Sequence, residues 1–228
     1  MESIYLFGTS TTASRVKSFI EFHKLYKIEA FLVDDNYKTS DSFEGYKILT
    51  VSEFRELPDY TKNLVFICLA WNRLNQDRRD LFNRYEQEFN LVNLVSPHSV
   101  IRGELAGTNI WVGDYSVLEM GSVVFSNCIM DHLCFVGSNT VLEKHNYVAV
   151  KAMIAGNTHI GEQNFIGINS TIFDEVKIGN KCIIAGGETI KRNIESFTVV
   201  KTFENEQVSK TYQENEIIEK LIANKNVR

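Results

Sequence analysis

The segment AVKAMIAGNTHIGEQNFIGINSTIFDEVKI, residues 149–178, carries an aliphatic side chain at every sixth position. An α-helix would require apolar spacing of three and four, and a half-buried strand would require strict alternation. A fixed short period instead predicts a solenoid, whose repeats bury their apolar faces by stacking on one another. The period runs through fourteen aliphatic or Met positions without a break: Val112, Leu118, Val124, Met130, Val136, Leu142, Val148, Ile154, Ile160, Ile166, Ile172, Ile178, Ile184 and Ile190.

Small residues recur at two further positions of the same repeat, and they indicate tight corners. The residue after the aliphatic position is often Gly or Ala, and the residue four positions after it is mostly Ser, Thr, Cys or Ala. Six residues therefore form one short strand and one corner, and three such units close a triangular coil of about 18 residues. Side chains 18 residues apart should then stack in columns along the edges of a prism.

The remainder of the chain lacks this period. Within residues 1–95, apolar runs alternate with amphipathic segments, and this order predicts a small parallel α/β domain. Pro97 marks the junction with a β-helix over residues 96–205. We expect residues 206–228 to form a helical tail, because their apolar residues fall on one stripe: Tyr212, Ile217, Ile218, Leu221 and Ile222.

Composition excludes several classes of protein. The chain has 228 residues and a net charge of −5, which disfavours nucleic acid and anionic membranes as main partners. Its apolar runs are too short to span a membrane, and its beginning does not read as a signal peptide. The four cysteines show neither metal-ligand nor disulfide spacing. We therefore expect a cytoplasmic protein without membrane insertion and without a metal site.

Three segments resemble a known family. IEAFLVDDNYKTSDSFEGYKIL (residues 28–49), VNLVSPHSVI (92–101) and IGEQNFIGINSTIFDEVKIGNKCIIAGG (160–187) resemble the hexapeptide-repeat nucleotide-sugar acyltransferases, the group of the UDP-amino-sugar N-acetyltransferases and sialic-acid O-acetyltransferases. The resemblance implies a Rossmann-like nucleotide-sugar domain followed by a left-handed parallel β-helix. It also implies a homotrimer with active sites between subunits, and acetyl-CoA or another acyl-CoA as co-substrate.

The nucleotide part of the substrate is placed by this resemblance. The first loop, formed by Gly8, Thr9, Ser10 and Thr11, would face the phosphates at a helix N-terminus. Asp34 and Asp35, after the second strand, would accept hydrogen bonds from base or ribose. The loop lacks the usual second and third glycines. A helix cap for the loop, and a solvated turn for the acidic pair, are the alternatives.

The cofactor groove is placed in the same way. By resemblance Ile168 and Gly186 line the pantetheine arm, with Ala185 beside them, and Lys191 contacts the CoA phosphates or else is simply solvated. The amide of Gly156 would meet the thioester carbonyl and stabilise the charge that develops on its oxygen.

The general base is ambiguous, because two alignments compete. Keeping the period in register puts Ser138 where the family has its histidine and Tyr147 where it has a second one. The motif MDHLCFVG (residues 130–137) instead resembles the histidine motif one hexapeptide earlier and favours His132. We expect His132 to take the proton, or else to be a surface corner residue. His145 is a further candidate, on a polar patch that could bind the sugar.

His98 and His159 are expected to be structural. The resemblance implies transfer of an acyl group to a nucleotide-linked sugar, and we expect the acceptor to be the amino group of a deoxy-amino sugar used for bacterial surface glycans such as the O-antigen of lipopolysaccharide. A neutral amine needs a base less than a hydroxyl does. Sugar O-acetylation and a catalytically idle sugar-nucleotide scaffold are the alternatives.

Overall fold

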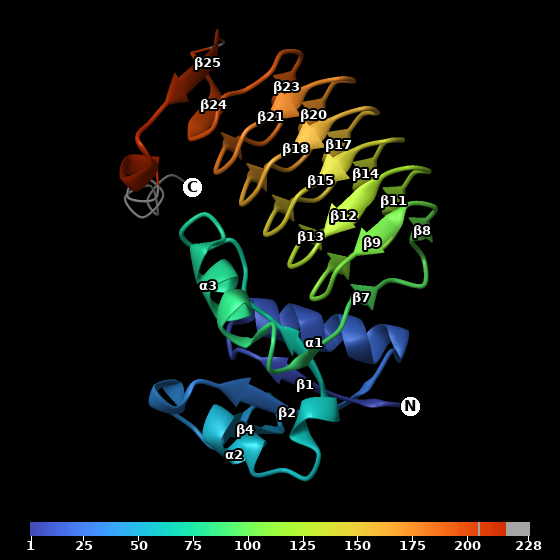
Figure 1. Cartoon of the computed structure of the whole chain (residues 1–228), viewed down its shortest axis with the longest axis vertical. Helices are drawn as coiled ribbons and strands as arrows, with labels where there is room; N and C mark the ends of the chain where they lie inside the picture. Colours follow the sequence, from blue (N-terminus) through green and yellow to red (C-terminus); the bar gives the residue numbers. More distant parts are fainter. Residues whose placement is uncertain (205, 218–228) are drawn as a thin grey trace. The chain divides into compact units, whose positions relative to one another are not determined.

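The computed structural model describes residues 1–204 and 206–217 (Figure 1). The chain divides into two compact units. The first contains residues 1–70 and 80–93, and the second contains residues 71–79 and the chain from residue 94 onward. Residues 71–79 thus belong with the β-helix, although the sequence analysis places them in the N-terminal domain.

The first unit is a mostly parallel sheet in the order β3-β4-β2-β1-β5-β6, with only β3 antiparallel. Its strands are β1 (Ser3–Phe7), β2 (Lys27–Val33), β3 (Ser42–Phe43), β4 (Tyr46–Thr50), β5 (Leu64–Ile67) and β6 (Asn90–Leu91). The helices are α1 (Thr11–His23) and α2 (Val51–Arg55), with short 3-10 turns at Asp35–Tyr37 and Tyr60–Lys62. The helix α3 (Gln76–Tyr85) begins in the second unit and belongs to the first from residue 80 onward.

Burial in this unit follows the sequence pattern. The strands β1, β2 and β5 carry fully buried apolar side chains, and α1 buries one face through Val16, Phe19 and Ile20. Because β2 and β5 flank β1 on opposite sides, the strand order reverses at the carboxyl end of β1. Open α/β sheets bind ligands at such a switch point.

The second unit is a three-walled parallel β-helix. Its first wall contains β7 (Leu94–Val95), β10 (Trp111–Val112), β13 (Ile129–Met130), β16 (Tyr147–Val148), β19 (Phe165–Ile166), β22 (Ile183–Ile184), β24 (Thr198–Phe203) and β25 (Glu206–Thr211). The second wall contains β8 (Val100–Ile101), β11 (Val117–Leu118), β14 (Phe135–Val136), β17 (Met153–Ile154), β20 (Thr171–Ile172) and β23 (Thr189–Ile190). The third wall contains β9 (Glu104–Ala106), β12 (Val123–Phe125), β15 (Val141–Leu142), β18 (His159–Ile160) and β21 (Lys177–Ile178).

The predicted period is confirmed by the strand register. From β10 to β23, paired strands of a wall lie 18 residues apart in the chain, as Leu118 and Val136 do, and Val136 and Ile154. Figure 1 shows the second wall as a stack that runs from β8 to β23. All fourteen aliphatic positions of the period are buried in one continuous core. Stacking of these aliphatic side chains from coil to coil, rather than intrinsic strand propensity, holds the coils together.

The walls meet at three kinds of corner. The first corner joins the first wall to the second (residues 131–134, 149–152 and 167–170, for example). The second corner joins the second wall to the third (137–140 and 155–158). The third corner joins the third wall to the first (143–146 and 161–164). Each turn contains one residue with left-handed backbone, such as Asn139 or Asn169. Asn tolerates that conformation better than most residues.

The C-terminal tail differs in part from the expectation. Residues 206–211 form β25, which pairs antiparallel with β24, and β24 continues the first wall next to β22. Helical backbone begins only at residue 214, and Ile217 is buried. Polar residues on both sides of Val208 suit a hairpin better than a helix stripe. The other residues of the expected stripe, from Ile218 on, lie outside the described residues.

Candidate functional site

The loop after β1 presents an open helix start. Gly8 has a φ of 121° and donates from its amide to the carbonyl of Leu32 at 2.8 Å. A side chain at Gly8 would meet Leu69 at 3.3 Å, so this loop requires glycine. Ser10 precedes α1 in extended conformation, and its side chain accepts no capping hydrogen bond within the part of the chain that the structure describes. The exposed hydroxyls of Ser10 and Thr11 therefore stand beside uncapped amides.

The acidic pair is held by the protein itself. Asp34 accepts hydrogen bonds from Arg84 at 2.7 Å and from the hydroxyl of Tyr85. Asp35 accepts from the amide of Ser52 at 3.0 Å and from the Ser52 hydroxyl. These bonds, the hydroxyl's first, lower the pKa of Asp35. Asp34 is partly buried and Asp35 is exposed, so both carboxylates have protein partners and keep capacity for further donors.

An exposed apolar strip lies on the first corner. His132, Val150, Ile168 and Gly186 stack there at intervals of 18 residues, and Ile168 is 57% exposed. A Cβ at Gly186 would lie 2.8 Å from Ile168 Cγ2, so the absence of a side chain keeps this strip open. Ala185 is half-buried beside it.

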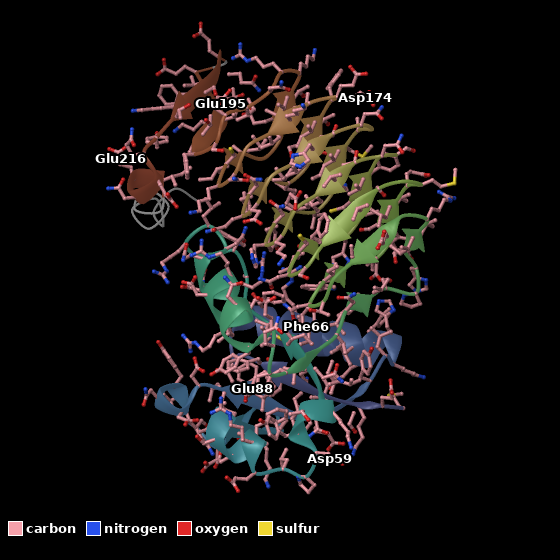
Figure 2. All side chains as sticks on the ribbon, in the orientation of Figure 1. Asp59, Phe66, Glu88, Asp174, Glu195 and Glu216 are labelled. Carbon is pink, nitrogen blue, oxygen red and sulfur yellow. The ribbon has the colours of Figure 1, made fainter. Side chains whose placement is uncertain are left out.

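The second corner holds Ser138, Gly156, Asp174 and Arg192. The amide of Gly156 donates to Asp174 Oδ1 at 2.9 Å. Asp174 is exposed at an outer edge of the β-helix (Figure 2). The thioester oxygen that the sequence analysis assigns to this amide must therefore displace Asp174. Ser138 is exposed, and its hydroxyl makes no hydrogen bond to any other described residue.

His132 is fixed by its own column. Its Nδ1 accepts a hydrogen bond from the amide of Asp114 at 2.9 Å, so the neutral ring carries its proton on Nε2. Nε2 faces Asp131 Oδ1 at 3.6 Å, and the buried Asp131 also accepts from His132's own amide and from the hydroxyl of Tyr147. In this arrangement the basic nitrogen of His132 is occupied, which does not support its expected role as general base.

His145 does not lie on an exposed patch. Its side chain is buried at the third corner, and its Nδ1 lies 2.8 Å from Asn127 Nδ2. A loop covers the ring, because Arg78 donates to the carbonyls of His145 and Asn146 at 3.1 and 3.0 Å. This burial leaves no room for the catalytic or sugar-binding role that the sequence analysis considered.

Residues 71–79, here called the strap, close the third corner. The side chain of Asn75 donates to the carbonyl of Asn164 at 2.9 Å, and that of Gln163 donates to the carbonyl of Leu74 at 2.9 Å. Arg79 donates to Gln163 at 2.6 Å, and the Trp71 ring lies 5.3 Å from that of Phe165. The sequence analysis missed these residues. The sequence feature that could have indicated a covered corner is the recurrence of amide side chains at intervals of 18: Asn109 and Asn127, and Asn146 and Asn164.

A second missed feature is a histidine–carboxylate pair on the third wall. His159 Nε2 lies 3.3 Å from Glu143 Oε1. No group of three or more metal-ligating side chains occurs among residues 1–204 and 206–217. A search of the same residues finds no helix of the length and apolarity needed to cross a bilayer.

The fold matches solved structures closely in shape but weakly in sequence. No protein-family model and no curated protein sequence matches the chain. The acetyltransferase domain of PglB from Neisseria gonorrhoeae FA1090 superposes with a TM-score of 0.77 at 18% identity, over 93% of this chain and 100% of that one. WeeI from Acinetobacter baumannii AYE gives 0.77 at 18% identity, over 91% and 100%.

PerB from Caulobacter crescentus, solved in complex with CoA and GDP-perosamine, gives a TM-score of 0.70 at 18% identity, over 92% and 98%. These matches confirm the predicted order of a parallel α/β sheet followed by a left-handed β-helix. The chain therefore has the fold of hexapeptide-repeat sugar acyltransferases.

Proposed function

We propose that this protein is an enzyme that transfers an acetyl group from acetyl-CoA to the amino group of a nucleotide-linked amino sugar. The observation that carries the proposal is the match to PerB. That protein binds CoA and GDP-perosamine, and the match extends over 92% of this chain and 98% of PerB. The PglB domain, a second neighbour, has been solved with acetyl-CoA.

The first corner supports binding of CoA. Ile168 and Gly186 form an exposed, apolar and flat strip along which a pantetheine chain could lie, with Ala185 at its side. Lys191 is exposed and extends over the ring of Phe173 at 5.2 Å. This cation lies beside Arg192 at the second corner, and a cation suits the CoA phosphates.

The first unit supports binding of the nucleotide. Uncapped amides at the start of α1 favour a phosphate, and the hydroxyls of Thr9, Ser10 and Thr11 add donors. The loop also lies at the switch point of the sheet. Asp34 and Asp35 would contribute acceptors beyond the hydrogen bonds that already hold them.

The reaction we propose is direct transfer. The amine attacks the thioester carbonyl, a C–N bond forms, the C–S bond breaks, and CoA leaves as the thiol after taking up the proton that the amine loses. The Gly156 amide would stabilise the oxyanion once Asp174 releases it. An amine acceptor is favoured over a hydroxyl because a perosamine N-acetyltransferase from Caulobacter crescentus is among the matching structures, and because a neutral amine needs a base less than a hydroxyl does.

A homotrimer is part of the proposal. The second wall and its flanking corners expose large apolar side chains that a monomer would leave in water. They are Tyr115, Met120, Leu133, Met153, Ile168 and Phe173. Association through this wall would bring the first corner of one subunit near the second corner of its neighbour. A cytoplasmic role in making a bacterial surface glycan completes the proposal.

The test is release of free CoA thiol from acetyl-CoA in the presence of UDP-, dTDP- and GDP-linked amino sugars. We expect turnover on one of them, with the product acetylated at nitrogen. The Ile168→Asp variant should raise the KM for acetyl-CoA, whereas Phe22→Asp, at an exposed site on α1, should not. Turnover only with hydroxyl acceptors would replace the proposal by O-acetylation. CoA binding without any turnover would indicate a scaffold.

A further inference from the structure

The outer surface of the third wall carries an imidazole held by a carboxylate. His159 begins β18, and Glu143 directly follows β15. His159 Nε2 lies 3.3 Å from Glu143 Oε1, with the two side chains 48% and 32% exposed. Because an ionised carboxylate only accepts hydrogen bonds, His159 must donate from Nε2.

That bond leaves the other ring nitrogen with the properties of a base. With the proton on Nε2, Nδ1 carries a lone pair, and no other residue that the structure describes contacts it by a hydrogen bond. His132 presents the opposite situation, because the Asp114 amide occupies its lone pair. An imidazole oriented by a carboxylate on one side and open on the other is the arrangement that activates nucleophiles.

His159 is also placed close to the corner that carries the candidate oxyanion donor. It follows the second corner directly, three residues after Gly156. Thr158, between them, is buried, and its hydroxyl donates to the carbonyls of Gly156 and Phe173 at 3.2 Å each. The backbone that connects the amide to the imidazole is therefore fixed by interior hydrogen bonds.

We propose that His159 is the general base of the transfer reaction and that Glu143 is its positioning residue. The inference rests on the proposed function. As the amine nitrogen bonds to the acyl carbon, His159 Nδ1 takes the proton that nitrogen loses. The tetrahedral intermediate then collapses, the C–S bond breaks, and the proton passes from the imidazolium to the departing CoA sulfur.

The competing interpretation is a surface ion pair. Val141 of β15 and Lys177 of β21 flank His159 in the wall, and Lys177 adds a positive charge on one side of the ring. Exposed pairs of this kind contribute little to stability. Substitutions at His159 and Glu143 should therefore leave the fold intact, which makes their effect on turnover interpretable.

The experiment compares His159→Ala, His132→Ala and Glu143→Gln with wild type, on the amino sugar that the wild type accepts. His159→Ala should lower kcat at least about 100-fold, the usual scale for a lost general base, with KM values for both substrates little changed. Added imidazole should restore part of the activity of His159→Ala, because the site is open to solvent. A merely structural histidine would not give such rescue. Glu143→Gln should give a smaller loss of kcat.

The matched control is Glu104→Ala, which removes an exposed carboxylate of β9 on the same third wall and away from the proposed subunit interface. It should keep wild-type turnover. Full activity in His159→Ala, or a loss of kcat confined to His132→Ala, would overturn the inference and leave the proposed function standing. Absence of turnover by the wild type on every amino sugar would overturn the proposed function instead, and the inference with it.

Discussion

The third and second corners of the β-helix share one backbone repeat but carry opposite kinds of side chain. The third corner has buried amides and the buried His145, and the strap covers it. The second corner has small and charged residues that are exposed, among them Ser138 and Asp174. The hexapeptide therefore determines the coil, whereas the residues at each corner determine whether that edge is closed by the protein or left open to a ligand.

The closed corner depends most on Arg78. Its guanidinium is fully buried and donates to two backbone carbonyls, and desolvation lowers its pKa to about 10. We expect Arg78→Ala to reduce the free energy of unfolding by about 3–5 kcal/mol, since it removes both of these buried hydrogen bonds and opens a cavity. Urea denaturation measures this free energy.

The control is Arg73→Ala, which removes an exposed i,i+4 pair with Asp77 and should reduce the free energy of unfolding by less than about 0.5 kcal/mol. Equal effects would mean that the strap does not stabilise the corner.

The open corner can be tested with two glycines, Gly137 and Gly156, that differ in the space available for a side chain. A Cβ at Gly137 would lie 2.6 Å from the amide nitrogen of Gly156, whereas a Cβ at Gly156 would lie 3.2 Å from the carbonyl of Ser138. Gly137→Ala should therefore destabilise the protein by about 1–3 kcal/mol. Gly156→Ala should cost less than about 1 kcal/mol, since only a small shift relieves it. Thermal unfolding of the two variants measures both losses of stability. A larger loss for Gly156→Ala than for Gly137→Ala would contradict the prediction.

The last prediction concerns the pH dependence of stability that comes from Cys128, the cysteine of the closed corner. Burial raises the pKa of the Cys128 thiol to about 12, and that of Cys182, in the same column, to about 11. Above the ordinary thiol pKa of about 8.5, the unfolded chain loses this proton while the folded chain keeps it, so stability falls as pH rises. Each such thiol should contribute a loss of about 1.4 kcal/mol per pH unit.

The measurement is the free energy of unfolding between pH 8.5 and 10 for wild type and Cys128→Ala. Other groups titrate in this range, so the difference between the two slopes is the readout. The variant should show the shallower decline. Parallel curves would mean that water reaches Cys128, and hence that the strap does not seal the third corner.

The sequence was sufficient for the β-helix because its core is filled by aliphatic side chains with one fixed period, one from each wall in every coil. It was insufficient for the strap, whose contacts join residues nearly 90 positions apart. Three consecutive residues of the strap, Arg73, Leu74 and Asn75, have left-handed backbone, which no local propensity indicates. The helical expectation for residues 206–211 failed because pairing with β24 outweighed the weak helical pattern.

For the candidate site, the sequence predicted which residues stack in the same column, but not which atoms of their side chains are free. The period placed His132 and Ser138 on their corners, yet which nitrogen of an imidazole is free depends on a backbone amide that no pattern reports. The sequence predicted His145 to lie on an exposed patch, because the strap that buries it is distant in the sequence. The pairing of His159 with Glu143 was not visible in the sequence, because Glu143 lies 16 residues away on the preceding coil.

The strap has a consequence for how such a protein can be recombined. The chain leaves the first unit at residue 70, contributes nine residues to the second, and returns at residue 80 before it leaves for good at residue 94. A chimera that joins the first 95 residues of one homologue to the β-helix of another would set a foreign loop on a row of buried amides. Exchange of substrate-binding halves should therefore succeed only when residues 71–79 travel with the coils that they cover.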